Sequence, residues 1–165
     1  WMKQNFPSID VWGIWREPRD IVSSIMRNDF YGEWYADGIA ELLPTIKGEE
    51  FLSETYLSFA DELNTDVKRT AFLLAVRTHF FLKYLDADKL IIYEEFRSAP
   101  SYLEVFLNNY GLASHNFDDL AKKDLNIIGK SMAANKGYHF SAEDSEFMER
   151  IFAPIQELKT QKFSV

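Results

Sequence analysis

The pattern of apolar positions along the chain begins with a strand that is followed closely by a helix. The run VWGIW at 11–15 is apolar throughout, as expected of a strand buried on both faces. Apolar residues then recur at helical spacing and predict a helix over about 19–29. The connection between the two is therefore a tight turn.

The middle of the chain predicts helices followed by a second strand. Helical periodicity is clear over 49–63 and again over 67–85. The segment 30–48 is rich in aromatic residues, glycine and proline, so we expect an irregular segment with one short helix at 36–43. The apolar run KLIIY at 89–93 predicts a strand. A strand–helices–strand order implies a right-handed crossover and a parallel sheet, with ligands outside the carboxyl ends of the strands.

The last third of the chain contains two helix signals and a basic loop. A helix is expected to start near Ser98 and to end at Gly111, which suits the C′ position. No acidic residue occurs between Asp124 and Glu143, which predicts a flexible, locally basic loop. The sequence SAED at 141–144 resembles a capping box and opens a last helix, which Pro154 interrupts or kinks.

Composition narrows the classes of function. The 165 residues are 47% hydrophobic, which is enough for one domain spanning 1–165 with a real core. The absence of cysteine, together with three scattered histidines, predicts no metal site. A formal net charge of -8 argues against a nucleic-acid surface. No apolar run approaches the roughly 20 residues that cross a bilayer, so we expect a protein of the cytoplasm.

The turn after the first strand has the character of an anion site. Pro18 suits the first helical position and Asp20 the first helical turn, where free backbone N–H groups favour an anion. A guanidinium presents paired donors to phosphate oxygens, and a hydroxyl adds one more. Arg16 and Ser24 are therefore expected to flank one phosphate-sized site.

Three segments, in order, resemble the C-terminal part of sulfotransferases that use 3′-phosphoadenosine-5′-phosphosulfate (PAPS). The first is NFPSIDVWGIWREPRDIVSS at 5–24, which is similar to the family's strand, Arg-x-Pro-x-Asp turn and helix. The second is KLIIYEEFRSAP at 89–100, followed by a helix and YGL. The third is the pair Phe140-Ser141, which in the family follows a basic, glycine-containing loop and here points back to Gly129-Lys130-Ser131. The resemblance covers roughly residues 4–155.

This resemblance implies a fold and a set of cofactor-binding residues. The implied fold is a three-layer, P-loop-like α/β nucleotide-binding fold with a parallel sheet, helix-rich and incomplete in this chain. Arg16 and Ser24 would hold the 3′-phosphate of PAPS, Tyr93 would lie near the adenine, and Lys130 would add a contact to the 3′-phosphate. Gly129 stands where the family commonly has an arginine, so one cationic contact is expected to be absent.

The resemblance also implies what the chain does and what it lacks. It would transfer a sulfuryl group from PAPS to the hydroxyl or amine of a small-molecule, glycan or lipid acceptor. The family's 5′-phosphosulfate loop and its general base would precede residue 1, so we interpret the chain as the C-terminal portion of such an enzyme. No catalytic residue is therefore assigned among these 165 residues.

Each assignment has an alternative in ordinary packing. In these alternatives, Arg16 would only pair with Asp20 or Glu17, and Ser24 would bond the backbone of its own helix. Tyr93 would be a strand-end aromatic that packs on the last helix. Arg19 is expected to be a solvated charge at a helix start. His79 lies in an apolar helix and is expected to be a packing histidine with no catalytic role.

Two other functions remain open on the sequence. A different P-loop-type enzyme, such as a small-molecule kinase, could share the strand, turn and helix. A chain without the phosphosulfate loop could also be a non-catalytic binding or assembly module. Binding of PAPS-type nucleotides in preference to ATP, or of neither, separates the three hypotheses.

Overall fold

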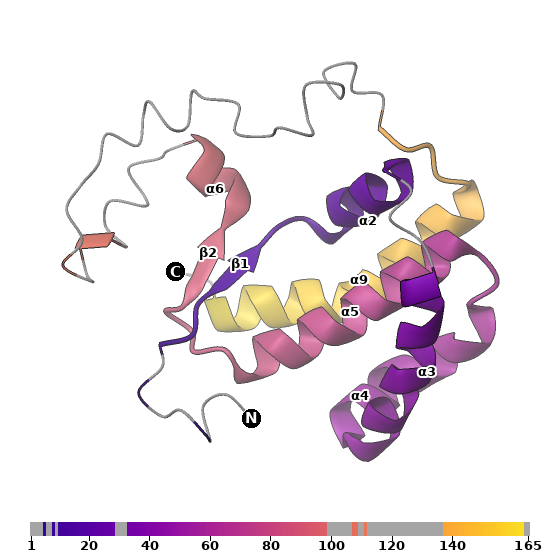
Figure 1. Ribbon diagram of the computed structural model, residues 1–165, viewed down its shortest axis with the longest axis horizontal. Coiled ribbons are helices and arrows are strands. Elements are labelled where there is room, and N and C mark those ends of the chain that lie inside the picture. The colour runs from indigo at the N-terminus through magenta and orange to yellow at the C-terminus, as the bar shows by residue number, and fades with distance from the viewer. Residues whose placement is uncertain are drawn as a thin grey trace. The chain divides into compact units, whose positions relative to one another are not determined.

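The computed structural model describes residues 5, 8, 10–28, 33–98, 107, 108, 111 and 137–163, with side chains omitted at 33–37 and 96–98. The described chain is rich in helices and contains a two-stranded parallel sheet (Figure 1). The prediction of an α/β protein with a parallel sheet is confirmed at this level. The chain forms two compact units, a larger one of Trp1–Val11, Glu17–Lys89 and Gly137–Val165, and a smaller one of Trp12–Arg16 and Leu90–Lys136.

The smaller unit contains the sheet. Strands β1 (Gly13–Trp15) and β2 (Leu90–Ile92) pair in parallel, with Gly13 opposite Leu90 and Trp15 opposite Ile92. Trp15 and Leu90 are buried, whereas Ile14 is 70% exposed. Each strand has three residues and is shorter than the apolar run that predicted it, 11–15 for β1 and 89–93 for β2.

The second strand ends before Tyr93, which is a correction to the sequence prediction. Tyr93 is the first residue of helix α6 (Tyr93–Ser98), and Glu94 and Glu95 occupy its first turn. Carboxylates in a first turn interact favourably with the positive end of the helix dipole. This local preference explains why the chain turns into a helix where an extended continuation was expected.

Two long helices form the centre of the larger unit. Helices α5 (Asp66–Tyr84) and α9 (Ala142–Phe163) lie side by side (Figure 1). The predicted apolar face of 67–85 is confirmed in its main positions. The buried apolar members of the two helices are Val67, Ala71, Phe72, Leu73, Ala75, Val76, Leu82, Phe147, Met148, Ile151, Phe152 and Ile155. Their burial supplies much of the apolar surface that stabilises this unit.

The segment after α2 (Pro18–Arg27) is more regular than the sequence predicted. Residues Glu33–Gly48 form one helix, α3, where an irregular segment was expected. Gly38 is buried beside Leu73, Ile46 is fully buried, and Pro44 is exposed. Packing of this helix against α5 outweighs the low helix propensity of glycine and proline.

The predicted helix over 49–63 is divided in two. Helix α4 (Glu50–Tyr56) is followed by the 3-10 helix η1 (Leu57–Glu62). Leu52 and Tyr56 are fully buried, whereas Leu57 is 38% exposed. The apolar spacing at 51, 52, 55, 59 and 63 therefore identified Leu52 as a buried residue, but it missed Tyr56 and the change of helix type.

One carboxylate joins the N-termini of α5 and α9. Thr65 caps α5 by accepting a hydrogen bond from the Lys68 backbone N–H at 3.2 Å. Ser141 accepts one from the Asp144 backbone N–H at 3.0 Å, so the N-cap contact of the predicted capping box is confirmed. The Asp144 carboxylate in turn accepts hydrogen bonds from both hydroxyls, each at 2.8 Å. The buried Lys68 ammonium pairs with Glu143 beside this link.

A tyrosine–histidine pair connects α4 and α5. The Tyr56 hydroxyl and His79 Nδ1 lie 2.9 Å apart, and their rings meet edge to face at 5.5 Å. Burial raises the pKa of Tyr56 above its ordinary value. Burial, and then the neighbouring Lys83 ammonium, lower the pKa of His79. His79 is thus a packing histidine, as the sequence indicated.

Protonation of His79 is expected to make stability depend on pH. Because the pKa of His79 is lower in the folded chain, the unfolded chain binds a proton at higher pH than the folded chain does. The stability that neutral His79 contributes is therefore present above about pH 6.5 and is lost as the pH falls. The loss from one such group is at most about 1.4 kcal/mol per pH unit. Urea unfolding between pH 7.5 and 5.5 should show the free-energy difference between wild type and His79→Gln shrinking as pH falls. A difference that stays constant over this range would contradict the assignment.

Candidate functional site

The candidate site lies at the carboxyl ends of the two strands. Trp15 and Ile92 are the last pair of the parallel register, so the residues that follow are Arg16 and Tyr93. Parallel strands end at the same edge of a sheet, and this edge is where open α/β sheets bind ligands. The backbone thereby brings together two residues that are far apart in sequence.

The side chains of Arg16 and Tyr93 are in contact. The Arg16 Cζ atom lies over the Tyr93 ring, 5.4 Å from its centroid, and both residues are half-buried. This is cation–π geometry. Within the described residues of the smaller unit, no carboxylate forms an ion pair with Arg16. The N–H donors of a guanidinium lie in its own plane, where they can bind an anion such as phosphate.

Ser24 lies on α2 in the larger unit, with Asn28 as its described partner. Its backbone carbonyl accepts a hydrogen bond from Asn28 Nδ2 at 2.7 Å, and its hydroxyl oxygen lies 3.5 Å from the same nitrogen. Ser24 is half-buried. Within the described residues of the larger unit, its hydroxyl forms no hydrogen bond with the backbone of α2. Lys130 and Gly129 lie outside the described residues.

The start of α2 contacts the segment that leads into α9. Ser23 Oγ accepts a hydrogen bond from the Tyr138 backbone N–H at 3.2 Å. Arg19 donates from Nη2 to Ser145 Oγ at 3.1 Å and lies over the Phe140 ring at 5.3 Å. The expectation that Arg19 is a solvated charge is therefore wrong. No local pattern in the sequence indicates these contacts, because the partners lie 126 and 115 residues apart.

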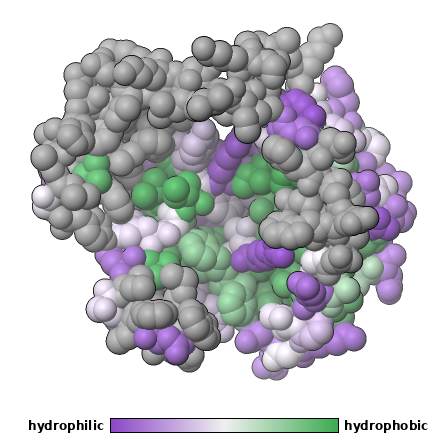
Figure 2. Space-filling view, viewed as in Figure 1, coloured by the Kyte–Doolittle hydropathy of each residue, from purple (hydrophilic) through white to green (hydrophobic). Residues whose placement is uncertain are grey.

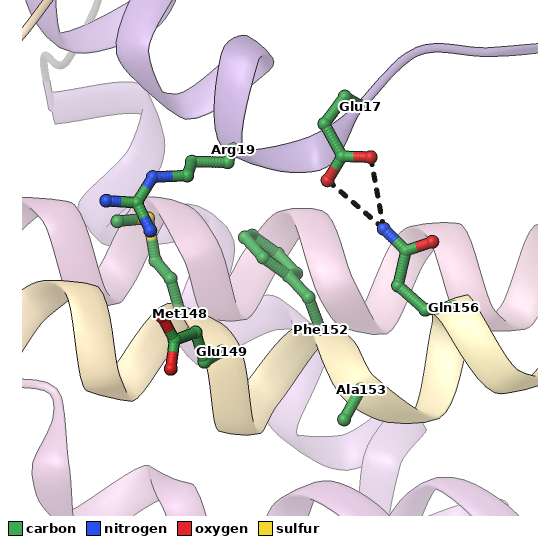
Figure 3. A pocket seen from close by; sticks show the side chains of 7 residues that line it. All are labelled: Glu17, Arg19, Met148, Glu149, Phe152, Ala153 and Gln156. Atoms are coloured by element: carbon green, nitrogen blue, oxygen red, sulfur yellow. Dashed lines mark hydrogen bonds between the residues drawn. The ribbon is translucent and has the colours of Figure 1, made fainter.

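A cavity of about 250 Å³ lies between the start of α2 and α9 and was not predicted (Figure 3). It is lined by Glu17, Arg19, Met148, Glu149, Phe152, Ala153 and Gln156. Gln156 Nε2 donates to both carboxylate oxygens of Glu17, at 3.1 and 3.2 Å, and Phe152 lies between the Arg19 and Gln156 ends of the cavity (Figure 3). Two carboxylates against one guanidinium make this cavity unfavourable for a phosphate.

The larger unit also exposes aromatic side chains on α5. Phe80 and Tyr84 are 38% and 54% exposed, with their ring centroids 4.9 Å apart. Phe80 stacks on Phe51 of α4, and the Lys83 ammonium lies 4.5 Å from the Phe51 ring centroid. On the face seen in Figure 2, apolar and hydrophilic residues are interspersed.

In the part of the chain that the structure describes, no group of three or more histidine, cysteine, aspartate or glutamate residues is arranged to hold a metal ion. None of the helices described has both the length and the apolar character needed to cross a membrane.

Comparison with known proteins adds no assignment. No family model, curated protein or solved structure matches the chain. The features that bear on function are therefore the residues at the strand ends and the three segments whose sequences resemble PAPS-dependent sulfotransferases.

Proposed function

We propose that this chain is the nucleotide-binding portion of a sulfotransferase that uses PAPS. The observation that carries the proposal is Arg16 at the carboxyl end of β1, with its guanidinium over Tyr93 at the end of β2. The same arginine opens the Arg-x-Pro-x-Asp turn on which the family resemblance rests. The proposed fold is the three-layer, P-loop-like arrangement of that family.

The proposed roles follow the resemblance residue by residue. Arg16 and Ser24 bind the 3′-phosphate of the cofactor, Lys130 adds a contact to it, and Tyr93 lies on the adenine side. The acceptor is a small molecule, glycan or lipid that carries a hydroxyl or amine. No general base is assigned to this chain.

Binding of the 3′-phosphate would assist a reaction at some distance from it. In sulfuryl transfer the acceptor oxygen or nitrogen attacks sulfur in line, and 3′-phosphoadenosine-5′-phosphate (PAP) leaves. Alignment of the reacting groups and stabilisation of charge carry much of the reduction in barrier. Binding energy from the remote phosphate can be used for that alignment.

Contacts within the larger unit support the proposal independently of Arg16. The resemblance includes the helix after the Arg-x-Pro-x-Asp turn and the segment around Phe140-Ser141. These two segments contact each other through Arg19 and Phe140 and through Ser23 and Tyr138. Two of the resembling segments are thus neighbours, as parts of one cofactor site would be.

Calorimetric titration of the full chain with PAP, AMP and ATP tests the proposal. PAP and AMP differ only in the 3′-phosphate, and each charge-assisted hydrogen bond contributes about 1.5–3 kcal/mol. We therefore expect PAP to bind at least about 30-fold more tightly than AMP. Preference for ATP over PAP would instead indicate a kinase-like enzyme. A folded chain that binds none of the three nucleotides would indicate a binding or assembly module, and either result overturns the proposal.

A further inference from the structure

We infer that Tyr93 is a positioning residue that holds the Arg16 guanidinium where it meets the 3′-phosphate. Tyr93 thereby contributes to selectivity for 3′-phosphorylated nucleotides. This inference rests on the proposed function. It assigns to Tyr93 a role exerted through a second side chain, in place of direct contact with adenine.

The backbone fixes both residues before any ligand binds. Arg16 and Tyr93 directly follow the paired residues Trp15 and Ile92, so the sheet register sets their separation. Tyr93 also begins helix α6, which restrains its backbone on the other side. A tyrosine ring held between a strand and a helix is a rigid support for a flexible side chain.

The ring and the guanidinium suit each other chemically. An arginine side chain has many rotamers, and ordering it when a ligand binds opposes binding. Contact with the Tyr93 ring, with Cζ 5.4 Å from its centroid, restrains the guanidinium before a ligand binds and leaves its N–H donors available to an anion. The ring face that carries the guanidinium is closed to an adenine base. The contact therefore gives Tyr93 a direct effect on the guanidinium that would bind the phosphate.

Affinities of Tyr93 variants for PAP and AMP test this role. Tyr93→Leu removes the aromatic face and is expected to weaken PAP binding about 5- to 10-fold, the range of a partly desolvated cation–π contact. AMP affinity should stay within about twofold, since AMP has no 3′-phosphate for Arg16 to bind. Tyr93→Phe keeps the ring and is expected to bind PAP as wild type does.

An Arg16→Met background provides the matched control. If Tyr93 acts through Arg16, adding Tyr93→Leu to Arg16→Met should cause no further loss of PAP affinity. Equal losses of PAP and AMP affinity in Tyr93→Leu would mean direct contact with adenine and would overturn the inference while leaving the proposed function intact. A wild-type chain that does not distinguish PAP from AMP overturns both. If Tyr93→Leu does not fold, Tyr93→Gln replaces it in the same titrations. The same comparison of PAP and AMP affinities then tests the inference.

Discussion

Replacing Arg16 with alanine is expected to weaken PAP binding about 100-fold, which corresponds to about 2.7 kcal/mol. The guanidinium is the charged donor at the strand ends, and a bidentate arginine–phosphate contact is among the stronger hydrogen-bonded pairs in proteins. The chain carries a formal net charge of -8, so attraction of an anionic nucleotide has to come from local cations. AMP affinity is expected to change less than about threefold. Isothermal calorimetry on both nucleotides measures the two effects.

Two control variants separate the site from the overall charge. Arg77→Ala removes the same charge from an exposed position on α5 and is expected to leave PAP affinity within about twofold. Arg16→Lys keeps the charge but loses the planar fork, and should give an intermediate loss of about 10-fold. If Arg77→Ala loses as much PAP affinity as Arg16→Ala, the effect is one of net charge. If Arg16→Ala binds PAP as wild type does, Arg16 does not bind the 3′-phosphate.

Elements with local signals were predictable from the sequence. Pro18 begins α2, and Ser141 caps α9 through the Asp144 backbone N–H, because these features depend on residues within one helical turn. Gly111 has a φ of 65°, the left-handed conformation expected of a C′ glycine. Helix α3 was not predicted, because burial of Ile46 and Gly38 against the rest of the unit is a property of the folded chain.

The candidate site was predictable only in part. A parallel sheet places strand ends at one edge, so Arg16 and Tyr93 could be assigned to the same edge from the sequence. Their stacking depends on the pairing of Trp15 with Ile92. Both apolar runs lack an alternation of apolar and polar residues that would fix this register. The link from Thr65 to Asp144 was missed for a similar reason, since each cap is a local signal and their contact spans 79 residues.

Truncation of Phe147 is expected to have the largest effect on stability, a loss of about 4 kcal/mol in the free energy of unfolding. Phe147 is 1% exposed, and its ring meets Phe59 of η1 edge to face at 5.6 Å. The Lys68 ammonium and the Arg150 guanidinium lie over the same ring, at 5.7 and 5.9 Å from its centroid. Phe147→Ala leaves a cavity between α9, α5 and η1 and removes these ring contacts together.

Chemical denaturation of Phe147→Ala, Phe147→Leu and Phe81→Ala measures the effect against matched changes. Phe147→Leu keeps most of the apolar volume and is expected to lose about 1.5 kcal/mol. Phe81 lies on α5 and is 39% exposed, so Phe81→Ala should lose only about 1 kcal/mol. A loss below about 1.5 kcal/mol in Phe147→Ala would mean that the packing of α9 on α5 and η1 contributes far less to stability than its burial indicates.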